Sequence, residues 1–426
     1  MSAYGGGGGG QVKYGCEDVV FGNSESLKIF DVNHFYRGSP YTAVFQNEMP
    51  GPPVRLACVP GLYDDLDLRL PFGYVKPAIE GCREVNLYGT GIYQGKKFLF
   101  FWFKNREKET TLDLGGSDGD FTLKVGRFPS ALSLANVPPG VRLVFDGTNQ
   151  PVHVTLKPEE QQRELAIVVS LIRAPIAIDG ASDVRLHAEG PSLLRLDGDG
   201  IRSLTIEGSR ELDLSITDRA MEHLDAIFAS RAVGPISVSA EQQRPIGVLG
   251  GYAGNSFTLT GPGDVAIATG PASDIIVLGA GNDIVDAGAG NDVIVAGAGR
   301  NVITTGAGRD SVVIQKPGDS VLPSQRPYSM TTVFDFDPEA GDCLRLAFPQ
   351  RGRLVDVDDM LKRVGETGVS VVSLESAAAA LRSVMAIDAV TALHWESDTY
   401  VIINNTDQTV VRLLGVVELT ENNIQF

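Results

Sequence analysis

Short apolar and aromatic runs, separated by clusters of glycine and proline, fill the first third of the chain. Lys97–Phe103 is one such run, and residues 50–53 are one such cluster. Strand-sized runs bounded by turn residues are typical of all-β domains. We therefore predict a β-sandwich-like domain over residues 14–156. The segment 1–13 contains Gly5–Gly10 and is predicted to be a flexible leader, unless the surface of a neighbouring subunit orders it.

The pattern changes over residues 157–251, where short apolar pieces recur at nearly regular intervals. Residues 159–173 fit either a helix that begins after Pro158 or a buried strand, and both interpretations stay open. Farther along, pieces such as Leu204–Ile206 and Leu212–Leu214 are separated by polar turns. Similar short rungs at regular spacing predict the stacked coils of a β-solenoid.

A strict nine-residue period governs residues 252–314. The rows start at Tyr252 and then always at a glycine, and the last of them read GAGNDIVDA, GAGNDVIVA, GAGRNVITT and GAGRDSVVI. The glycine-rich half of a row predicts a turn, and the mostly apolar half predicts a strand. One apolar position recurs from row to row and is predicted to form a thin core, made of Ile276, Val285, Ile294, Ile303 and Val312.

The turn half of each row carries oxygen donors of the kind that hard cations prefer. Glycines at alternate turn positions permit dihedral angles that are closed to other residues, so main-chain carbonyl oxygens can face a common centre. An aspartate or asparagine stands at one fixed position of the row. An oxygen-only cage with flexible coordination suits calcium better than zinc or copper. The candidate Ca²⁺ ligands are Asp274, Gly279, Gly281, Asp283, Gly288, Gly290, Asp292, Gly297, Gly299, Asn301 and Asp310.

These rows resemble the repeats-in-toxin (RTX) nonapeptide, G-G-x-G-x-D-x-U-x, in which U is a large apolar residue. The resemblance implies a parallel calcium β-roll over residues 252–330, in which two nonapeptides make one coil and each turn stacks on the turn two rows later. The pair with an asparagine lacks one charge and should bind calcium more weakly. The neighbours expected from this stacking are Asp274 with Asp292, Asp292 with Asp310, and Asp283 with Asn301.

The resemblance also implies folding by calcium outside the cell. Ordering one residue costs about 1–2 kcal/mol of backbone entropy. Because the core of the roll is thin, ion binding must supply much of the folding free energy. Family members leave the cell unfolded through a type I secretion channel. We therefore expect a secreted, extracellular or cell-surface protein that uses type I secretion machinery, which fits an opening without the regions of a secretory leader.

Residues 331–426 are predicted to form a β-rich cap and secretion module that contains short helices. A cap would cover the strand edges that an open solenoid exposes. The order of elements over residues 195–426 resembles that of RTX surface-layer proteins. The predicted elements are strands at Val333–Pro338 and Asp342–Leu346, a helix at Ser373–Met385, and a strand pair at Trp395–Ile402 and Val411–Gly415.

Charge and composition narrow the range of partners. The chain has 53 acidic and 36 basic residues, and its formal net charge of −17 would repel nucleic acid and anionic headgroups. It also lacks a run of about eighteen apolar residues, so we expect neither a nucleic-acid partner nor membrane insertion. The cysteines are too few for a disulfide scaffold and are expected to be free thiols; the alternative is one bridge among Cys16, Cys58 and Cys82, without Cys343.

Catalytic motifs are sparse. Neither the zinc motif H-E-x-x-H nor a phosphate-binding loop occurs. Gly115–Gly119 matches G-x-S-x-G, but residues 121–125 predict a strand where a nucleophile elbow needs a helix. A glycosidase or lyase based on paired carboxylates stays open. The histidines are scattered singly and are interpreted as surface or core residues: His34, His153, His187, His223 and His394.

The sequence thus predicts an all-β chain: a β-sandwich-like N-terminal domain, a parallel β-solenoid with a calcium β-roll, and a β-rich C-terminal cap. The predicted function is that of a secreted calcium-binding structural protein, not an enzyme. It would self-assemble into a surface layer, fibre or extracellular matrix. The alternative is a calcium-stabilised adhesin that binds carbohydrate or a host surface, with cell-surface polysaccharide as a candidate partner.

Overall fold

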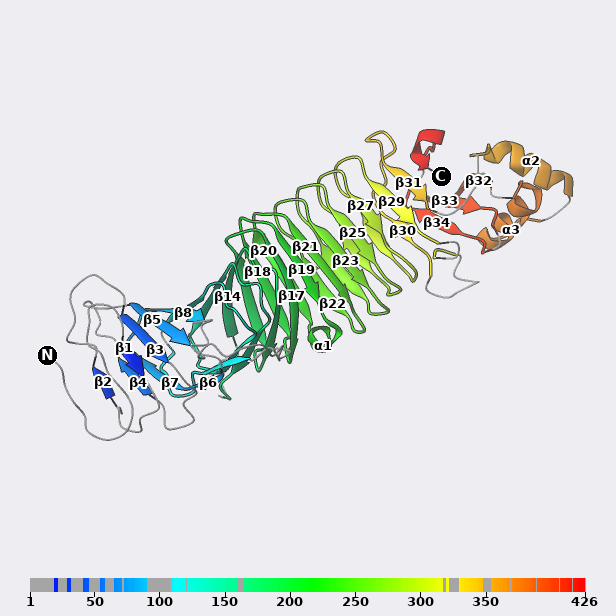
Figure 1. Cartoon of the computed structure of the whole chain (residues 1–426). Coiled ribbons are helices and arrows are strands. Elements are labelled where there is room, and N and C mark those ends of the chain that lie inside the picture. The colour runs from blue at the N-terminus through cyan, green and yellow to red at the C-terminus, as the bar shows by residue number, and fades with distance from the viewer. Residues whose placement is uncertain are drawn as a thin grey trace, which may run out of the picture. The chain divides into compact units, whose positions relative to one another are not determined.

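The structure is a computed structural model, drawn in Figure 1, and it describes most of the chain from residue 65 onward. The predicted leader 1–13, the run Lys97–Phe103, and Cys16, His34 and Cys58 lie outside the residues whose side chains are described. The described residues are 19–21, 29–31, 41–45, 54–57, 65–70, 73–89, 109–119, 121–158, 164–316, 319–321, 329–347, 354–367, 370–387, 389–405, 407–415 and 417–425.

The chain divides into two compact units, Met1–Leu224 and Asp225–Phe426. Within each unit, successive strands enter two parallel sheets in turn, so that coil stacks on coil (Figure 1). Each coil of a parallel β-solenoid adds one strand to each sheet in this way. The prediction of an all-β chain with a parallel solenoid is confirmed.

The first unit carries two long sheets, one small sheet and the short helix α1 (Asp218–Met221). The first sheet contains β1 (Val19–Phe21), β3 (Tyr41–Phe45), β5 (Asp65–Leu70), β8 (Glu84–Gly89), β10 (Thr122–Val125), β12 (Arg142–Asp146), β14 (Glu164–Ser170), β16 (Asp183–Ala188) and β18 (Ser203–Gly208). The second contains β6 (Gly73–Val75), β9 (Thr110–Asp113), β11 (Leu132–Val137), β13 (Val152–Leu156), β15 (Pro175–Asp179), β17 (Ser192–Asp199) and β19 (Leu212–Ile216). The small sheet contains β2 (Ile29–Asp31), β4 (Val54–Ala57) and β7 (Pro77–Glu80).

The β-sandwich predicted for residues 14–156 is not confirmed, because the described strands of this range pair in parallel. Thr122 of β10 is in register with Glu84 of β8 and with Arg142 of β12, and Arg142 is in register with Ala166 of β14. The spacing between partners varies from coil to coil, so no repeat marks these coils in the sequence. Short alternating strands with glycine and proline turns fit either architecture. The segment left open at 159–173 contains the strand β14.

The second unit carries the nonapeptide rows and the C-terminal elements. Its first sheet contains β20 (Ala226–Ala232), β22 (Ile246–Leu249), β24 (Val265–Ala268), β26 (Ile284–Asp286), β28 (Val302–Thr304), β30 (Thr332–Val333), β34 (Val410–Leu413), β33 (Asp398–Ile403) and β32 (Val390–Trp395). Its second contains β21 (Ile236–Glu241), β23 (Ser256–Thr260), β25 (Ile275–Leu278), β27 (Val293–Val295), β29 (Ser311–Ile314), β31 (Cys343–Leu346) and β35 (Ile424–Gln425). The helices are α2 (Val357–Thr367), α3 (Leu374–Val384) and the 3-10 turn η2 (Glu421–Asn423).

The core of the roll is the one predicted from the nine-residue period. Ile276, Ile294 and Val312 stack in β25, β27 and β29, and Val285 stacks on Ile303 in β26 and β28. All are at most 1% exposed. Each coil therefore buries only a few side chains between two short strands, and the roll lacks a large apolar core.

The C-terminal elements extend the roll and then turn back on themselves. β31 pairs with β29, and β30 pairs with β28, both in parallel. β32, β33 and β34 then form an antiparallel meander. The predicted helix is α3, which begins after the N-cap Ser373 and packs Leu381 against Met360 of α2 in a separate small core. The predicted cap with short helices is thus present.

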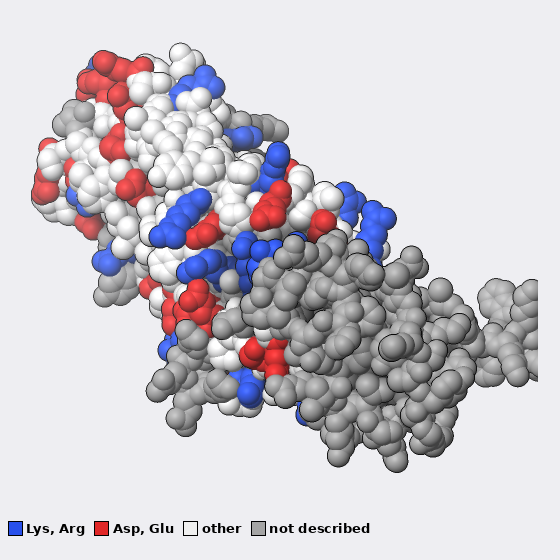
Figure 2. Space-filling view, turned by 90° about the vertical axis from the view of Figure 1, so that its left-hand side faces the viewer, with Lys and Arg blue, Asp and Glu red and all other residues white. Residues whose placement is uncertain are grey.

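Acidic and basic side chains lie close to one another on the face shown in Figure 2. Among the ion pairs of the described residues, that of Lys124 with Glu84 has a distance of 2.7 Å. Cys82 is buried and forms a disulfide, in line with the alternative prediction of one bridge among the N-terminal cysteines. Cys343 is a buried free thiol.

Among the described residues, no helix has the length and apolar character needed to cross a bilayer.

Candidate calcium-binding site

Glycines occupy both edges of the roll because neighbouring coils approach too closely for a side chain. A Cβ atom added to Gly279 or Gly281 would lie 2.1 or 2.3 Å from a carbonyl oxygen of the preceding coil. These two glycines do not have positive φ angles, so the dihedral reason predicted from the sequence is wrong for them. Both reasons hold at Gly288, Gly290, Gly297 and Gly299, whose φ angles are positive.

Carbonyl oxygens of the turn glycines take part in the stacking. Gly279 accepts the N–H of Ala298 at 3.0 Å, and Gly288 accepts the N–H of Ala307 at 2.9 Å. A carbonyl oxygen has two lone pairs, so each of these oxygens keeps one for a further partner.

Aspartates stack at the edge of the roll that precedes β25, β27 and β29. Asp274 donates its main-chain N–H to Oδ1 of Asp292 at 2.7 Å, and Asp292 donates its own to Oδ1 of Asp310 at 2.8 Å. Each bond spans 18 residues, and all three side chains are buried. The structure thus brings these predicted neighbours together. We call Asp274, Asp292 and Asp310 the aspartate column.

The opposite edge, which precedes β26 and β28, repeats this arrangement with one substitution. Val265 donates its N–H to Oδ1 of Asp283 at 2.8 Å, and Asp283 donates its own to Oδ1 of Asn301 at 3.0 Å. The third predicted pair, Asp283 and Asn301, is therefore also in contact, and both side chains are buried.

The second carboxylate oxygen, Oδ2, of Asp283, Asp292 and Asp310 is buried and has no hydrogen-bond partner within the described part of the chain. Burying a carboxylate without a partner is costly. Burial raises the pKa of Asp283 and of Asp292 to about 7, and it also raises the pKa of Asp310. A bound cation would supply the missing partner and neutralise the buried charge. Carboxylate and carbonyl oxygens are the ligands that calcium prefers, so the residues fit this ion.

Asn301, at the same position, has hydrogen-bond partners without an ion. Its side-chain N–H groups donate to the carbonyl oxygens of Ala296 at 3.3 Å and Gly297 at 3.2 Å. One coil before the aspartate column, Asn255 also donates to the carbonyl of Gly251 at 3.3 Å, but its own Oδ1 is buried without a partner among the described residues. The amide of Asn301 thus bonds the carbonyl oxygen of Gly297, which is one of the candidate ligands. The contrast agrees with the expectation that the coil of Asn301 binds calcium more weakly.

Asp342, which the nine-residue period did not predict, continues the aspartate column beyond the repeats. Asp310 donates its N–H to Oδ1 of Asp342 at 2.8 Å, in the same way as the earlier members, but across 32 residues. Asp342 is 1% exposed. Its position could not be predicted from the period, because the intervening chain interrupts the rows.

A second, exposed ladder runs beside the aspartates and was also missed. Asn282 donates its N–H to Oδ1 of Asp264 at 2.7 Å, and Arg300 donates to Oδ1 of Asn282 at 3.0 Å. Asn291 and Arg309 form the equivalent bond at 2.9 Å on the other edge. The signal was present in the rows, since a residue with a side-chain oxygen often precedes the aspartate position.

The other candidate residues have structural partners. Ser117 is buried and accepts the N–H of Ile79 at 2.9 Å, and the segment after it is the strand β10, as predicted. His153 contacts Asp179 at 2.8 Å on the surface, and His394 contacts the hydroxyl of Thr399 at 2.9 Å. The hydroxyl of Thr399 also donates to the carbonyl oxygen of Gly415 at 3.0 Å and accepts the N–H of Val417 at 2.8 Å, so main-chain partners hold it in place.

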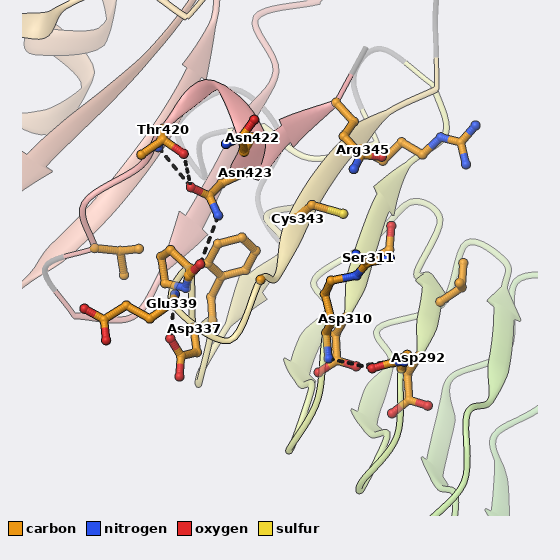
Figure 3. Close-up of a pocket in the computed structure, with 18 of the residues that line it drawn as sticks. Asp292, Asp310, Ser311, Asp337, Glu339, Cys343, Arg345, Thr420, Asn422 and Asn423 are labelled. Carbon is orange, nitrogen blue, oxygen red and sulfur yellow. Dashed lines mark hydrogen bonds between the residues drawn. The ribbon is translucent and has the colours of Figure 1, made fainter.

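A groove of about 1080 Å³ lies beside the end of the aspartate column, between the last turns and the C-terminal segment (Figure 3). Asp292 and Asp310 line it on the roll side, and Asn423 lines it on the C-terminal side. Phe336 is the one aromatic residue among its lining residues, and this side chain is 6% exposed. The groove therefore offers little aromatic surface on which a sugar ring could stack.

Within the described residues, no three His, Cys, Asp or Glu side chains gather closely enough to hold a metal by themselves. An ion at the edge of the roll therefore needs main-chain carbonyl oxygens beside its carboxylates. The fold and the site together define a calcium-binding β-roll protein.

Comparison with known proteins identifies the repeat. The family model of the RTX calcium-binding nonapeptide repeat (4 copies) matches residues 269–303 and 277–312. No curated protein matches the chain. The chain thus contains RTX nonapeptide repeats, and repeats of this kind bind Ca²⁺.

Proposed function

We propose that this chain is an exported structural protein whose roll is folded by calcium and whose folded solenoid assembles with copies of itself at the cell surface. The observation that carries the calcium part is the buried, unpartnered Oδ2 of Asp283, Asp292 and Asp310. Calcium supplies positive charge and accepts oxygen ligands from both carboxylates and carbonyls. The proposed ligands are Asp274, Gly279, Gly281, Asp283, Gly288, Gly290, Asp292, Gly297, Gly299, Asn301 and Asp310.

Export through type I secretion machinery is supported by the same chemistry. A chain whose roll needs calcium stays unfolded where calcium is scarce, inside the cell, and folds where it is plentiful, outside. The disulfide at Cys82 supports an extracellular location independently, because disulfides persist in oxidising compartments.

The calcium part is tested with Asp292→Asn and the matched control Asp286→Asn. Asp286 has the same charge but lies exposed on the outer face of β26. Calcium titration followed by circular dichroism should show a folding transition in wild type. Asp292→Asn should need several-fold more calcium, while Asp286→Asn should follow wild type. Equal midpoints for all three proteins would overturn the proposed ligand set.

Self-assembly is supported by apolar side chains gathered on an outer face of the second unit. Phe228 of β20 and Leu249 of β22 are direct neighbours in the sheet and are 41% and 43% exposed. Tyr252, three residues after Leu249 in the chain, is 63% exposed. Single exposed apolar residues are common on protein surfaces. Neighbouring ones on a sheet face, such as Phe228 and Leu249, form a surface that another chain can cover.

Electron microscopy of the full-length protein tests assembly, with millimolar calcium and again with chelator. We expect sheets or filaments in calcium alone. The double variant Phe228→Ser/Leu249→Ser should bind calcium as wild type does but lose the assemblies. The matched control is Ile387→Ser, which removes an apolar side chain that is 83% exposed and distant in sequence. Dispersed wild-type monomers under both conditions would leave adhesion to polysaccharide or a host surface as the better proposal.

A further inference from the structure

The aspartate column does not end where the nonapeptide rows end. After Asp310 the chain leaves the repeat, yet Asp342 enters the next position of the column. The main chain repeats the pattern as well: Ser311 donates its N–H to the carbonyl oxygen of Asp292, and Cys343 donates to that of Asp310, both at 2.8 Å. The turn before β31 therefore stacks on the turn before β29 as one roll coil stacks on another.

Asp310, Asp335 and Asp342 carry carboxylates on or against these two turns, although the three do not lie closely enough to hold a metal without main-chain ligands. Asp335 accepts the N–H groups of Thr305 at 2.7 Å and Gly306 at 2.8 Å, so its side chain lies over the same turn as Asp310. None of the three forms an ion pair with a Lys or Arg in the part of the chain that the structure describes.

One oxygen in this group is left without any partner. Oδ1 of Asp310 accepts the N–H of Asp292, whereas its Oδ2 is buried and unpartnered among the described residues. The Asp310 side chain as a whole is 1% exposed. Asp342 accepts an N–H group on each carboxylate oxygen, from Asp310 at Oδ1 and from Asp337 at Oδ2, both at 2.8 Å. A carboxylate oxygen that accepts one hydrogen bond keeps a lone pair, so the carboxylate of Asp342 and the unpartnered Oδ2 of Asp310 fit a divalent cation with oxygen ligands.

The C-terminal segment holds this turn from the other side. The side-chain amide of Asn423 donates to the carbonyl oxygens of Asp342 at 3.0 Å and of Pro338 at 3.4 Å (Figure 3 shows Asn423 and the neighbouring Thr420). Ile424 then pairs with Leu344 of β31. The turn that carries Asp342 is thus placed between the last repeat coil and the end of the described chain.

We propose that Asp342 and Asp310 form a last calcium site outside the repeats, and that filling this site locks η2 and β35 onto the roll. Main-chain carbonyl oxygens of the two turns complete the ligands. The inference rests on the proposed function, since it requires that the repeats bind calcium. It adds that calcium controls the docking of residues 421–425 as well as the folding of the repeats.

The test compares full-length wild type, Asp342→Asn and Asp213→Asn. Asp213 is an exposed aspartate on β19, in the other unit, and controls for the loss of one charge. Isothermal titration calorimetry counts the bound calcium ions, and hydrogen exchange follows the amides of residues 421–425. Asp342→Asn should bind one ion fewer than wild type and lose calcium-dependent protection of 421–425, while the amides of β25 and β27 stay protected. Asp213→Asn should match wild type in both measurements.

An unchanged ion count in Asp342→Asn would overturn the inference and leave the proposed function standing. Absence of calcium binding by wild type would overturn the proposed function instead. If Asp342→Asn fails to fold, hydrogen exchange of wild type still tests the inference. Protection of residues 421–425 should then rise with calcium. Protection that is independent of calcium would contradict the proposed calcium-dependent docking of η2 and β35. Asn423→Ala adds a positive check, since it should keep the wild-type ion count but lose protection of 421–425.

Discussion

Asn301 stands in the same relation to Asp283 as Asp310 does to Asp292. In each pair the earlier residue donates its main-chain N–H to Oδ1 of the later one, at 3.0 Å and 2.8 Å. The difference lies at the second side-chain atom. Asp310 buries an unpartnered oxygen there, whereas the nitrogen of Asn301 donates to carbonyl oxygens of its own turn. On one edge of the roll, the side chain of Asn301 therefore has hydrogen-bond partners without calcium.

Asn301→Asp should convert this coil into a stronger calcium site. The change removes two hydrogen bonds to carbonyl oxygens and adds a buried charge, so in chelator it should destabilise the roll by about 1–3 kcal/mol. In calcium it should bind the ion more tightly, because ligand charge raises affinity. Calorimetric titration measures both the number of ions and their affinity. Asn291→Asp is the matched control: it makes the same change on the exposed ladder, and a similar gain there would contradict the argument.

Acidification should stabilise the chelated roll and weaken calcium binding. Asp283 and Asp292 have pKa values of about 7 in the folded roll without calcium. Unfolded aspartate has a pKa of about 3.9, so the folded state binds more protons between these values. The stability gained is present at low pH and is lost as pH rises through about 7. Circular dichroism in chelator at pH 5.5 and pH 8 measures this difference as the amount of folded roll, which should be larger at pH 5.5, and Asp283→Asn/Asp292→Asn should flatten it. In calcium the order should reverse, because protons compete with the ion for the same oxygens.

Truncating the core should raise the calcium requirement. Ile294 is fully buried in β27, and Ile294→Ala should cost about 2–5 kcal/mol. Because folding and ion binding are linked, the calcium midpoint of folding should move to higher concentration. Ile284 is 58% exposed on β26, so Ile284→Ala should leave the midpoint almost unchanged. Circular dichroism during calcium titration distinguishes the two, and a shared midpoint would show that the core contributes little.

The nine-residue period allowed the roll to be predicted in detail, because every row repeats the same local contacts. The core position of Ile294 and the neighbours of Asp292 followed from counting residues. The same counting failed at Asp342, which occupies the next place in the column after a long interruption of the period. The position of Asp342 in the column is shown by its hydrogen bond with the main-chain N–H of Asp310, which the spacing of residues along the chain does not reveal.

The parallel coils of the N-terminal region were not predicted, for a related reason. Strand pairs such as Thr122 with Arg142 and Arg142 with Ala166 join rungs of unequal length, so the parallel register leaves no period in the sequence. Alternation of apolar and polar residues reveals a strand and its buried face but not its partner. An antiparallel sandwich and a parallel solenoid therefore give the same alternation of apolar and polar residues in the sequence.

Replacing a turn glycine should disrupt stacking even though the substitution keeps the main-chain carbonyl that is proposed to bind calcium. Gly299 has a φ angle of +109°, and a Cβ at this position would lie 2.0 Å from the carbonyl oxygen of Gly281. Gly299→Ala must therefore push neighbouring coils apart, and overpacking with backbone strain should cost at least about 1–3 kcal/mol. Gly365→Ala is the control, since nothing lies within 4 Å of its added Cβ in α2 and alanine favours the helix. Gly299→Ala should raise the calcium midpoint and lower the thermal unfolding temperature, whereas Gly365→Ala should raise that temperature slightly. Equal behaviour of the two variants would mean that close stacking does not limit the residue type at the edge of the roll.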